Sequence, residues 1–256
     1  MRQLDGVISP ARILNAQEEI KILRELLERN DLKETIIGSG SARIVFDSEE
    51  DYVIKLGIGE SGYLQNMREL ERFQEDKDAG FLAVLEGIGR FILLQEKVSS
   101  ADEELRDIFG NYYMNDSDGV EDCVAEIMEY MDCSEEEARD MVEVYKTACD
   151  YYGETTDNAQ IGKTAHRGWV LYDYGYVPGE DSNQASGMSY ILTDNINELR
   201  DYIQYCINLL EAAISEDDML VEMRKADKAI HSKTPLVEED EEEEEIPEDT
   251  VDFRIE

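Results

Sequence analysis

The chain has 256 residues, of which 42% are hydrophobic, and its 62 acidic against 24 basic side chains give a formal net charge of −38. This length and apolar content suffice for a folded core of one domain, or of one domain with two lobes, and they exclude a generally disordered protein. The excess of acid disfavours direct binding to nucleic acid or to an anionic membrane, because both interactions need Lys and Arg.

The acidity is not confined to the end of the chain. Residues 238–256 hold 12 acids and one arginine, and the other 237 residues still carry a net charge of −27. Such self-repulsion destabilises a compact state unless salt screens it, and at molar ionic strength the screening length is only about 3 Å. Two interpretations remain open. One is a protein of a halophilic archaeon or of its virus, adapted to a very salty cytoplasm. The other is an acidic protein with basic partners in an ordinary cell.

The four cysteines lack the paired spacing of a zinc site or a redox motif. We therefore interpret them as small core residues in a reducing compartment. No apolar run approaches the roughly 20 residues that a membrane-spanning helix needs, and no secretory signal is evident. We expect a cytoplasmic protein, in the cytoplasm of the host cell if a virus encodes it.

The first 98 residues predict a small sheet accompanied by two helices. Asn15 and Glu18 form a cap-like pair that opens the first helix, and an acidic turn separates the second and third strands. The expected helices span residues 16–30 and 61–76, and the expected strands span residues 34–38, 42–46, 52–56, 81–85 and 90–98.

After Val98 the pattern changes to helices. Ser134 and Glu137 form a capping box, and a short apolar strand follows near residues 169–174. The expected helices span about 120–131, 134–152, 196–210 and 217–231. From Pro235 onward the acidic run predicts disorder. The chain is thus divided into residues 1–98, 99–234 and 235–256.

Three features of the first part follow one another as an ATP-phosphate clamp requires. Gly38-Ser39-Gly40 forms a glycine-rich turn, Lys55 lies on a following strand, and Glu69 lies on the next helix. Two glycines let a hairpin backbone approach phosphates closely, a lysine neutralises their charge, and a glutamate holds that lysine in place. Much later in the chain, an apolar strand ends in Asp173-Tyr-Gly, where the glycine permits a sharp turn.

These motifs resemble the protein-kinase-like superfamily, and more narrowly the short kinase-like proteins of tailed phages and archaeal viruses. The resemblance covers roughly residues 34–175. It implies a two-lobed α+β fold with a small antiparallel-sheet N-lobe, a helical C-lobe and a disordered acidic C-terminal tail. The run that carries it reads Gly38-Ser-Gly40-Ser-x-Arg43-x-Val45, then Lys55, Gly62 and Gln65-Asn66-x-x-Glu69.

The resemblance implies a nucleotide site. The turn at residues 38–40 would cover the phosphates of ATP, and Val45 would cover the adenine. Lys55 would contact the α- and β-phosphates. The backbone of Glu96 and Val98, in the hinge between the lobes, would bind the edge of the adenine.

The resemblance also implies a metal site and a catalytic group. Glu69 would pair with the lysine, and Asp173 would bind Mg²⁺ with Gln160 as a second ligand. Asp157 is the nearest carboxylate for orienting the acceptor hydroxyl. Asn158 competes with Gln160 for the role of second metal ligand.

Two positions depart from the family pattern. Thr155 stands five residues before Gln160, where the pattern has the catalytic aspartate, and Arg43 replaces the third glycine of the phosphate loop. These departures leave nucleotide binding as the better supported expectation and put phosphoryl transfer in question.

Three functions are compatible with the sequence. The first is a small, possibly virus-encoded kinase-like phosphotransferase that uses ATP and Mg²⁺ to modify a protein hydroxyl. The second is a pseudokinase that serves as a binding or virion-assembly module. The third is an acidic mimic that occupies a basic, nucleic-acid-binding protein, which only the charge supports. The expected partners are accordingly a nucleotide and either a protein substrate or a basic protein.

Overall fold

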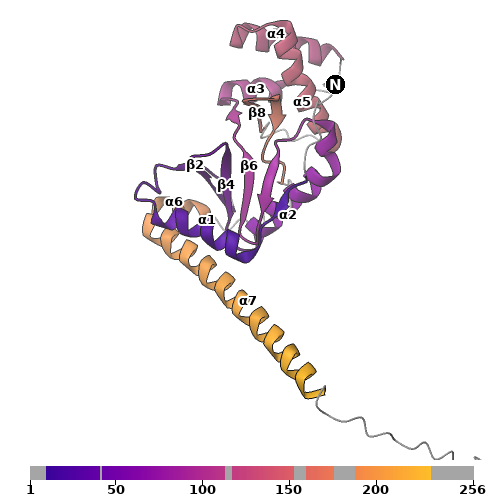
Figure 1. Ribbon diagram of the computed structural model, residues 1–256. Helices are drawn as coiled ribbons and strands as arrows, with labels where there is room; N and C mark the ends of the chain where they lie inside the picture. Colours follow the sequence, from indigo (N-terminus) through magenta and orange to yellow (C-terminus); the bar gives the residue numbers. More distant parts are fainter. Residues whose placement is uncertain (1–9, 41, 113–116, 153–159, 176–187, 232–256) are drawn as a thin grey trace, which may run out of the picture. The chain divides into compact units, whose positions relative to one another are not determined.

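The computed structural model describes residues 10–40, 42–112, 117–152, 160–175 and 188–231 (Figure 1). The chain divides into two compact units, Met1–Ala212 and Ala213–Glu256. The elements below belong to the first unit, apart from the C-terminal part of the last helix. Thr155, Asp157, Asn158 and the acidic tail lie outside the described residues.

A six-stranded sheet, in the order β1-β5-β6-β4-β3-β2, forms the N-terminal part of an α+β fold. Its strands are β1 (Arg12–Ile13), β2 (Ile36–Ser39), β3 (Arg43–Asp47), β4 (Tyr52–Gly57), β5 (Leu85–Ile88) and β6 (Ile92–Glu96). Most pairs are antiparallel, as expected, but β1 runs parallel to β5. The sheet is therefore mixed, and the purely antiparallel prediction is wrong at this edge. A two-residue strand is too short to show the alternation that marks a strand in sequence.

The first helix, α1 (Ala16–Glu28), begins at the predicted cap. The side chain of Asn15 accepts the N–H of Glu18 at 3.0 Å, and the Glu18 carboxylate accepts the N–H of Asn15 at 3.0 Å. The next residue, Glu19, is buried and fastens the helix to the β5–β6 turn. Its carboxylate accepts three successive backbone N–H groups, those of Arg90, Phe91 and Ile92, at 2.5 to 3.0 Å.

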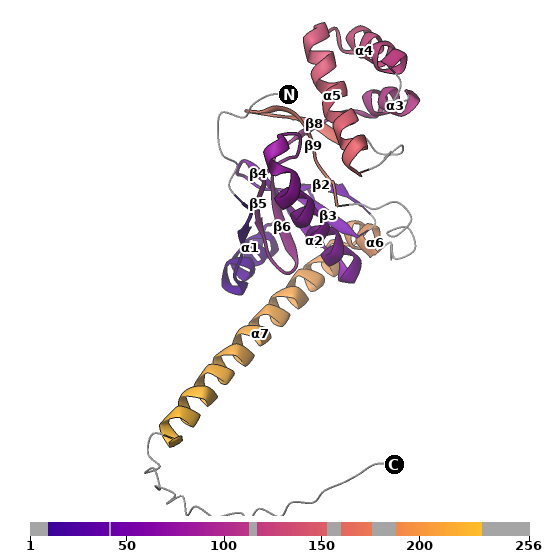
Figure 2. The same cartoon turned by 90° about the vertical axis from the view of Figure 1, so that its right-hand side faces the viewer.

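The second helix, α2 (Gly59–Asp76), packs on β4 and β5 and leads into a 3₁₀ turn at Lys77–Ala79 (Figure 2). Its start lies very close to the sheet: a Cβ on Gly62 would be 2.5 Å from the carbonyl oxygen of Ala42 and 2.6 Å from the backbone of Gly57. Only glycine allows this approach, which explains its place in the motif. The helix thereby directs the motif side chains Gln65, Asn66 and Glu69 into the interior.

Helices dominate the middle of the chain, as predicted. They are α3 (Glu103–Asn111), α4 (Ser117–Met131) and α5 (Glu135–Tyr152), and they gather beside a second sheet of β7 (Ser99–Ser100), β8 (Ile161–Thr164) and β9 (Gly168–Leu171) (Figure 1). Of these, α3 and the β7–β8 pair were not predicted. One hydrophobic cluster joins this part to the first sheet, with Phe73 and Leu93 on one side and Phe109 and Met141 on the other.

The last two helices return to the N-terminal elements. The short α6 (Met188–Asp194) contacts β2 and β3. The guanidinium of Arg200, on α7 (Ile196–His231), donates to the carbonyl oxygens of Leu27 and Arg29 at the C-terminal end of α1. Both predicted ranges, 196–210 and 217–231, are helical, but the prediction of two separate helices is wrong, because α7 runs through both without a break. The residues between them include two alanines and no glycine or proline, so nothing interrupts the helix.

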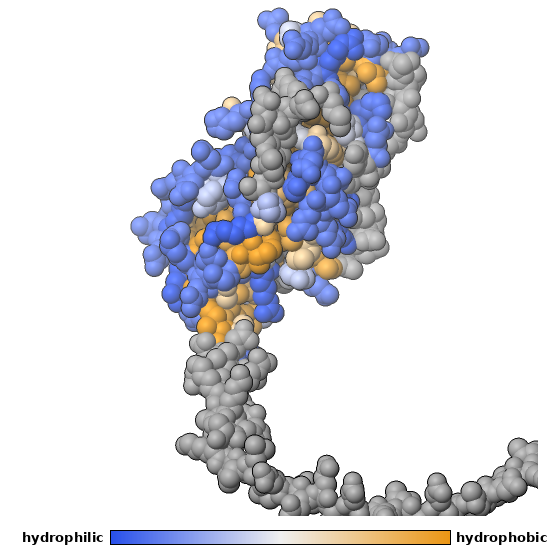
Figure 3. All heavy atoms as spheres, turned by 45° about the vertical axis from the view of Figure 1, so that its right-hand side comes forward, coloured by the Kyte–Doolittle hydropathy of each residue, from blue (hydrophilic) through white to orange (hydrophobic). Residues whose placement is uncertain are grey.

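Hydrophilic side chains cover most of the face shown in Figure 3, with hydrophobic ones gathered in a few places. This agrees with the large excess of acid. Within the described residues, no helix has both the length and the apolar character needed to cross a bilayer. The cysteines are free thiols, and Cys123 and Cys206 are buried, as expected of core residues.

Candidate functional site

The structure brings Lys55 and Glu69 together as an ion pair. Lys55 lies on the central strand β4, opposite Val45 of β3, and Glu69 lies on the inner face of α2. The Nζ atom of Lys55 is 3.0 Å from each carboxylate oxygen of Glu69. The two side chains are 4% and 0% exposed, so the pair is fixed within the core rather than formed at the surface.

Arg43 extends this pair into a chain of four charges. It lies on β3 two residues before Val45, and therefore on the same face of the sheet as Lys55. Its Nη1 atom donates to Oε1 of Glu69 at 2.6 Å, and its Nη2 atom donates to Oδ1 of Asp173. The arginine side chain is only 5% exposed, whereas that of Asp173 is 38% exposed. In the sequence, Arg43 was noted as part of the glycine-rich motif and as the replacement of its third glycine, but this bridge was not predicted.

The cluster changes the ionisation of its members. The pKa of Lys55 is lowered to about 8, mainly by burial; the Glu69 carboxylate raises it, and the Arg43 charge lowers it. Burial alone raises the pKa of Glu69, but the Arg43 and Lys55 charges outweigh it and hold that pKa below its ordinary value. Glu69 is therefore a carboxylate shared by two cations at neutral pH.

Asp173 begins a tight turn that rests on α2. Its φ of 44° lies in the left-handed region, which is uncommon for a residue other than glycine. The neighbouring Tyr174 is buried and its hydroxyl donates to the carbonyl oxygen of Ala83 at 2.9 Å. A Cβ on Gly175 would lie 2.4 Å from the carbonyl oxygen of Gln65 and 2.7 Å from Cγ of Glu69. The glycine therefore lets the turn sit directly against Glu69.

Gln160 lies across a hairpin from Asp173. The strands β8 and β9 pair Ile161 with Leu171, and the N–H of Tyr172 donates to the carbonyl oxygen of Gln160 at 2.7 Å. The residues predicted as the two metal ligands thus flank the same end of this hairpin. Asp157, which was predicted to orient the acceptor hydroxyl, lies outside the described residues.

The same hairpin carries the single tryptophan of the chain. Trp169 lies on β9, is 7% exposed, and has the Nζ atom of Lys163 at 6.0 Å from its ring centroid. Its buried Nε1 atom has no hydrogen-bond partner among the described residues. It is a core residue.

The glycine-rich turn joins β2 and β3 and is held from both sides. The N–H of Gly40 donates to the carbonyl oxygen of Arg43 at 2.9 Å, and the carbonyl oxygen of Gly40 accepts the hydroxyl of the buried Ser189 from α6. Among the described residues, a Cβ on Gly40 would meet no atom within 4 Å, whereas one on Gly38 would touch Val45 at 3.9 Å. The space beside Gly40 is therefore open to a ligand.

The predicted hinge has part of its hydrogen-bonding capacity in use. The N–H of Glu96 donates to the carbonyl oxygen of Val84 at 3.0 Å. The Glu96 carboxylate accepts the N–H of Val84 at 2.8 Å and pairs with Arg167. An adenine would therefore have to be bound by the carbonyl of Glu96 and by Val98, and not by the N–H of Glu96. Val98 packs against Gly162. A Cβ on Gly162 would lie 2.4 Å from the Cγ1 atom of Val98.

Two buried amides lack partners within the described part of the chain. Neither amide atom of Asn66 forms a hydrogen bond, and neither does Nε2 of Gln95. Both side chains are buried. An unpaired buried amide costs on the order of 1–3 kcal/mol, so these groups are available to a bound ligand or water. Asn66 lies near the end of β4, because a Cβ on Gly57 would be 3.2 Å from its Nδ2 atom.

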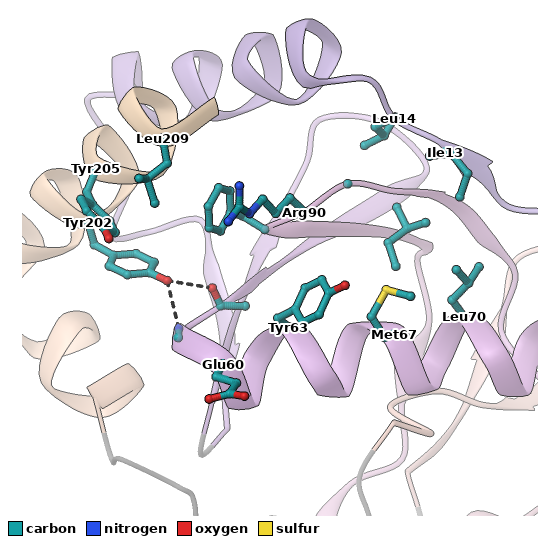
Figure 4. A pocket seen from close by; sticks show the side chains of 15 residues that line it. Ile13, Leu14, Glu60, Tyr63, Met67, Leu70, Arg90, Tyr202, Tyr205 and Leu209 are labelled. Carbon is teal, nitrogen blue, oxygen red and sulfur yellow. Dashed lines mark hydrogen bonds between the residues drawn. The ribbon is translucent and has the colours of Figure 1, made fainter. Parts of the chain in front are cut away.

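A cavity of about 830 Å³ lies elsewhere, bounded by α2, the β5–β6 turn and α7 (Figure 4). Tyr63 and Met67 line it from a different face of α2 than the one that carries Glu69. On its other side, the hydroxyl of Tyr202 donates to the carbonyl of Gly57 and accepts the N–H of Gly59, both at 3.1 Å. None of the predicted nucleotide or metal residues lines this cavity.

No group of three or more His, Cys, Asp or Glu side chains in the described ranges could hold a metal ion alone. A metal at Asp173 would therefore need oxygen atoms from a ligand as well. Comparison with protein-family models, with curated proteins and with solved structures finds no match to this chain.

Proposed function

We propose that the chain is a small, two-lobed kinase-like phosphotransferase that binds ATP with Mg²⁺ and transfers the γ-phosphoryl group to a protein hydroxyl. The observation that carries the proposal is the seating of the Asp173 turn against the Lys55–Glu69 pair. Gly175 lies against Glu69, and Arg43 connects that carboxylate to Asp173. Three motifs that are far apart in sequence thus form one cluster of charges with a partly exposed carboxylate.

The donor atoms at this cluster fit a magnesium nucleotide. Mg²⁺ prefers oxygen ligands, and in nucleotide sites it takes one or two from the protein and others from phosphates and water. The partly exposed carboxylate of Asp173, with Gln160 across the hairpin, would supply that pattern. The phosphates would lie beside the turn at Gly40 and be contacted by the ammonium group of Lys55. When bound, Mg²⁺ would neutralise phosphate charge and orient the γ-phosphoryl group.

Each protein residue then has a defined task. Lys55 would bind the α- and β-phosphates, and Glu69 would keep its ammonium group in position. Asp157 would orient the acceptor hydroxyl and take up its proton. The acceptor oxygen would form a bond to the γ-phosphorus as the bond to the β-phosphate oxygen breaks, which releases ADP.

Calorimetric titration of Mg-ATP, at low and at molar salt, tests the proposal. We expect binding that requires Mg²⁺, is lost in Asp173→Ala and is weakened in Lys55→Ala. Transfer of labelled γ-phosphate to protein should be lost in the same two variants. Equal transfer by the double variant and by the wild type would refute the proposal.

A second candidate is a non-catalytic binding module with the same fold. The contact of Arg43 with Asp173 favours it, because an arginine satisfies the carboxylate that a metal would need. The replaced catalytic aspartate at Thr155 favours it too. This module would show either no thermal shift with millimolar Mg-ATP, or a shift without phosphate transfer.

A further inference from the structure

We propose that Arg43 is a positioning residue that competes with the metal ion for Asp173, so that the metal binds tightly only together with nucleotide. The inference rests on the proposed function, because it concerns the same site. It goes beyond that function because it predicts that Arg43 determines how tightly the metal binds when no nucleotide is present.

The geometry gives Arg43 two carboxylates to hold at once. One nitrogen of its guanidinium donates to Glu69 on α2, and the other donates to Asp173 at the end of the hairpin. The side chain is buried and is anchored on β3, where it faces Gly57 across the strand pair. Arg43 therefore ties a strand, a helix and the Asp173 turn together through one planar group.

The charges of this cluster balance without a metal. Lys55 and Arg43 supply two positive charges, and Glu69 and Asp173 supply two negative ones, in one continuous chain of contacts. A divalent ion on Asp173 would place two further positive charges beside a buried guanidinium. A metal ion and a guanidinium bound to the same carboxylate repel each other strongly in a poorly hydrated site. Arg43 has to leave Asp173, or the metal binds weakly.

A nucleotide resolves the conflict because its phosphates offer the guanidinium a new anionic partner. Arginine binds phosphate in the same forked geometry that it uses for carboxylate. Arg43 can keep Glu69 with one nitrogen and exchange Asp173 for a phosphate oxygen with the other. Metal and nucleotide should thus strengthen each other's binding by the same factor, as linkage requires.

Titration of Mn²⁺ without nucleotide, followed by the electron paramagnetic resonance signal of the free ion, tests the competition. We expect weak binding by the wild type and binding about tenfold tighter or more in Arg43→Gln, with no tight binding in Asp173→Asn. Arg43→Ala provides a second neutral variant, and thermal unfolding shows whether each variant is folded. Arg43→Lys keeps the charge but loses the guanidinium that contacts two carboxylates at once. Its Mn²⁺ affinity should lie between those of the wild type and Arg43→Gln.

Arg72→Ala is the matched control, because Arg72 donates to the carbonyl oxygen of Tyr174 in the same turn. It removes an equal charge close by without freeing the Asp173 carboxylate, so its Mn²⁺ affinity should stay near that of the wild type. Unchanged or weaker Mn²⁺ binding in folded Arg43→Gln, equal tightening in Arg72→Ala, or no Mn²⁺ binding by any variant would overturn the inference.

A second arm adds a non-hydrolysable ATP analogue. In the wild type it should tighten Mn²⁺ binding, and in Arg43→Gln this gain should be smaller. An analogue that does not bind at all would refute the proposed function, although tighter metal binding in Arg43→Gln would still establish the competition. Analogue binding with no effect of Arg43 on the metal would refute only the competition.

Discussion

At the scale of single residues, the environment of Lys55 disfavours the protonated, charged form of its side chain. Burial and the nearby Arg43 charge bring its pKa to about 8, although Glu69 holds it through two contacts of 3.0 Å. The ordinary value for lysine is 10.5, so the charged form is penalised in the folded protein. A bound phosphate would add a second anion and should raise this pKa again.

Mg-ATP binding should therefore take up a proton when the pH exceeds about 8. Below this value Lys55 is already charged in the free protein, and above it the ammonium group has to be restored on binding, so affinity should fall as pH rises. Calorimetry at pH 9 in buffers of different ionisation enthalpy measures the uptake. Lys55→Met should bind more weakly and show no such uptake. Binding by the wild type at pH 9 without proton uptake would contradict the expected role of Lys55.

Glu19 should contribute more to stability than its surface neighbours. Glu19→Ala leaves three backbone N–H groups of the β5–β6 turn without their acceptor, at a cost of about 2–4 kcal/mol. Urea unfolding measures this change. Glu25→Ala on the same helix is the control, since its exposed pair with Lys21 should be worth less than about 0.5 kcal/mol. Similar losses of unfolding free energy in both variants would show that Glu19 does not hold α1 to the β5–β6 turn.

The pH dependence of this contribution has a definite sign. Burial raises the pKa of Glu19, and its three backbone N–H bonds reduce the shift without cancelling it. The folded protein then binds the proton more tightly than the unfolded chain. Stability from this residue is greatest at acid pH and falls as the pH rises from the unfolded pKa through the folded one. Glu19→Gln should remove that slope.

At the scale of elements, close contact between α2 and β4 positions Glu69 opposite Lys55. Gly62→Ala would push a methyl group to 2.5 Å from the carbonyl oxygen of Ala42. Although alanine favours a helix by about 1 kcal/mol over glycine, we expect a net loss of about 1–3 kcal/mol and weaker nucleotide binding. Chemical unfolding and calorimetry measure the two effects.

Gly40→Ala is the matched control for this glycine, because its methyl group would meet no atom of the structurally described part of the chain within 4 Å. It should leave stability nearly unchanged but weaken Mg-ATP binding, since the methyl group would enter the proposed phosphate space. Loss of stability in Gly40→Ala, or unchanged nucleotide affinity in both variants, would contradict this assignment.

Local signals predicted the elements that contain them. The pair of Asn15 and Glu18 gave the start of α1, and the motif with Lys55 gave the central strand. Elements whose existence depends on distant partners escaped: β1 is two residues long and is held by β5. The continuity of α7 escaped as well, although glutamate and alanine, which favour a helix, make up most of the interval between the two predicted helices.

At the scale of the whole molecule, charge repulsion should limit stability at low salt. The net charge of −38 opposes compaction, and salt reduces this repulsion. We expect the unfolding midpoint to rise between 0.1 M and 2 M NaCl by roughly 2–4 °C for each kcal/mol gained. NaCl and KCl should act alike, whereas sulfate is unsuitable because it also stabilises by exclusion from the surface. A midpoint that stays constant or falls would favour the interpretation of an acidic protein with basic partners.

The candidate site could be predicted in part, because its motifs are local but its connections are not. Lys55, Glu69 and Asp173 each stand in a recognisable run of residues, and the structure brings them into one cluster. The bridge through Arg43 spans 130 positions to Asp173, and no pattern near either residue indicates it. The burial of Glu19 escaped for the same reason, since its partners lie more than 70 residues away.

Trp169 gives the protein an internal optical probe. As the only tryptophan, it makes the long-wavelength emission report a single position, four residues before Asp173 on the same hairpin. Its indole is buried and lies beside the Lys163 ammonium group. A displacement of this hairpin would therefore change the emission wavelength and the intensity of its fluorescence. Ligand-induced movement at the Asp173 turn can thus be followed in the unlabelled protein, on the time scale of rapid mixing.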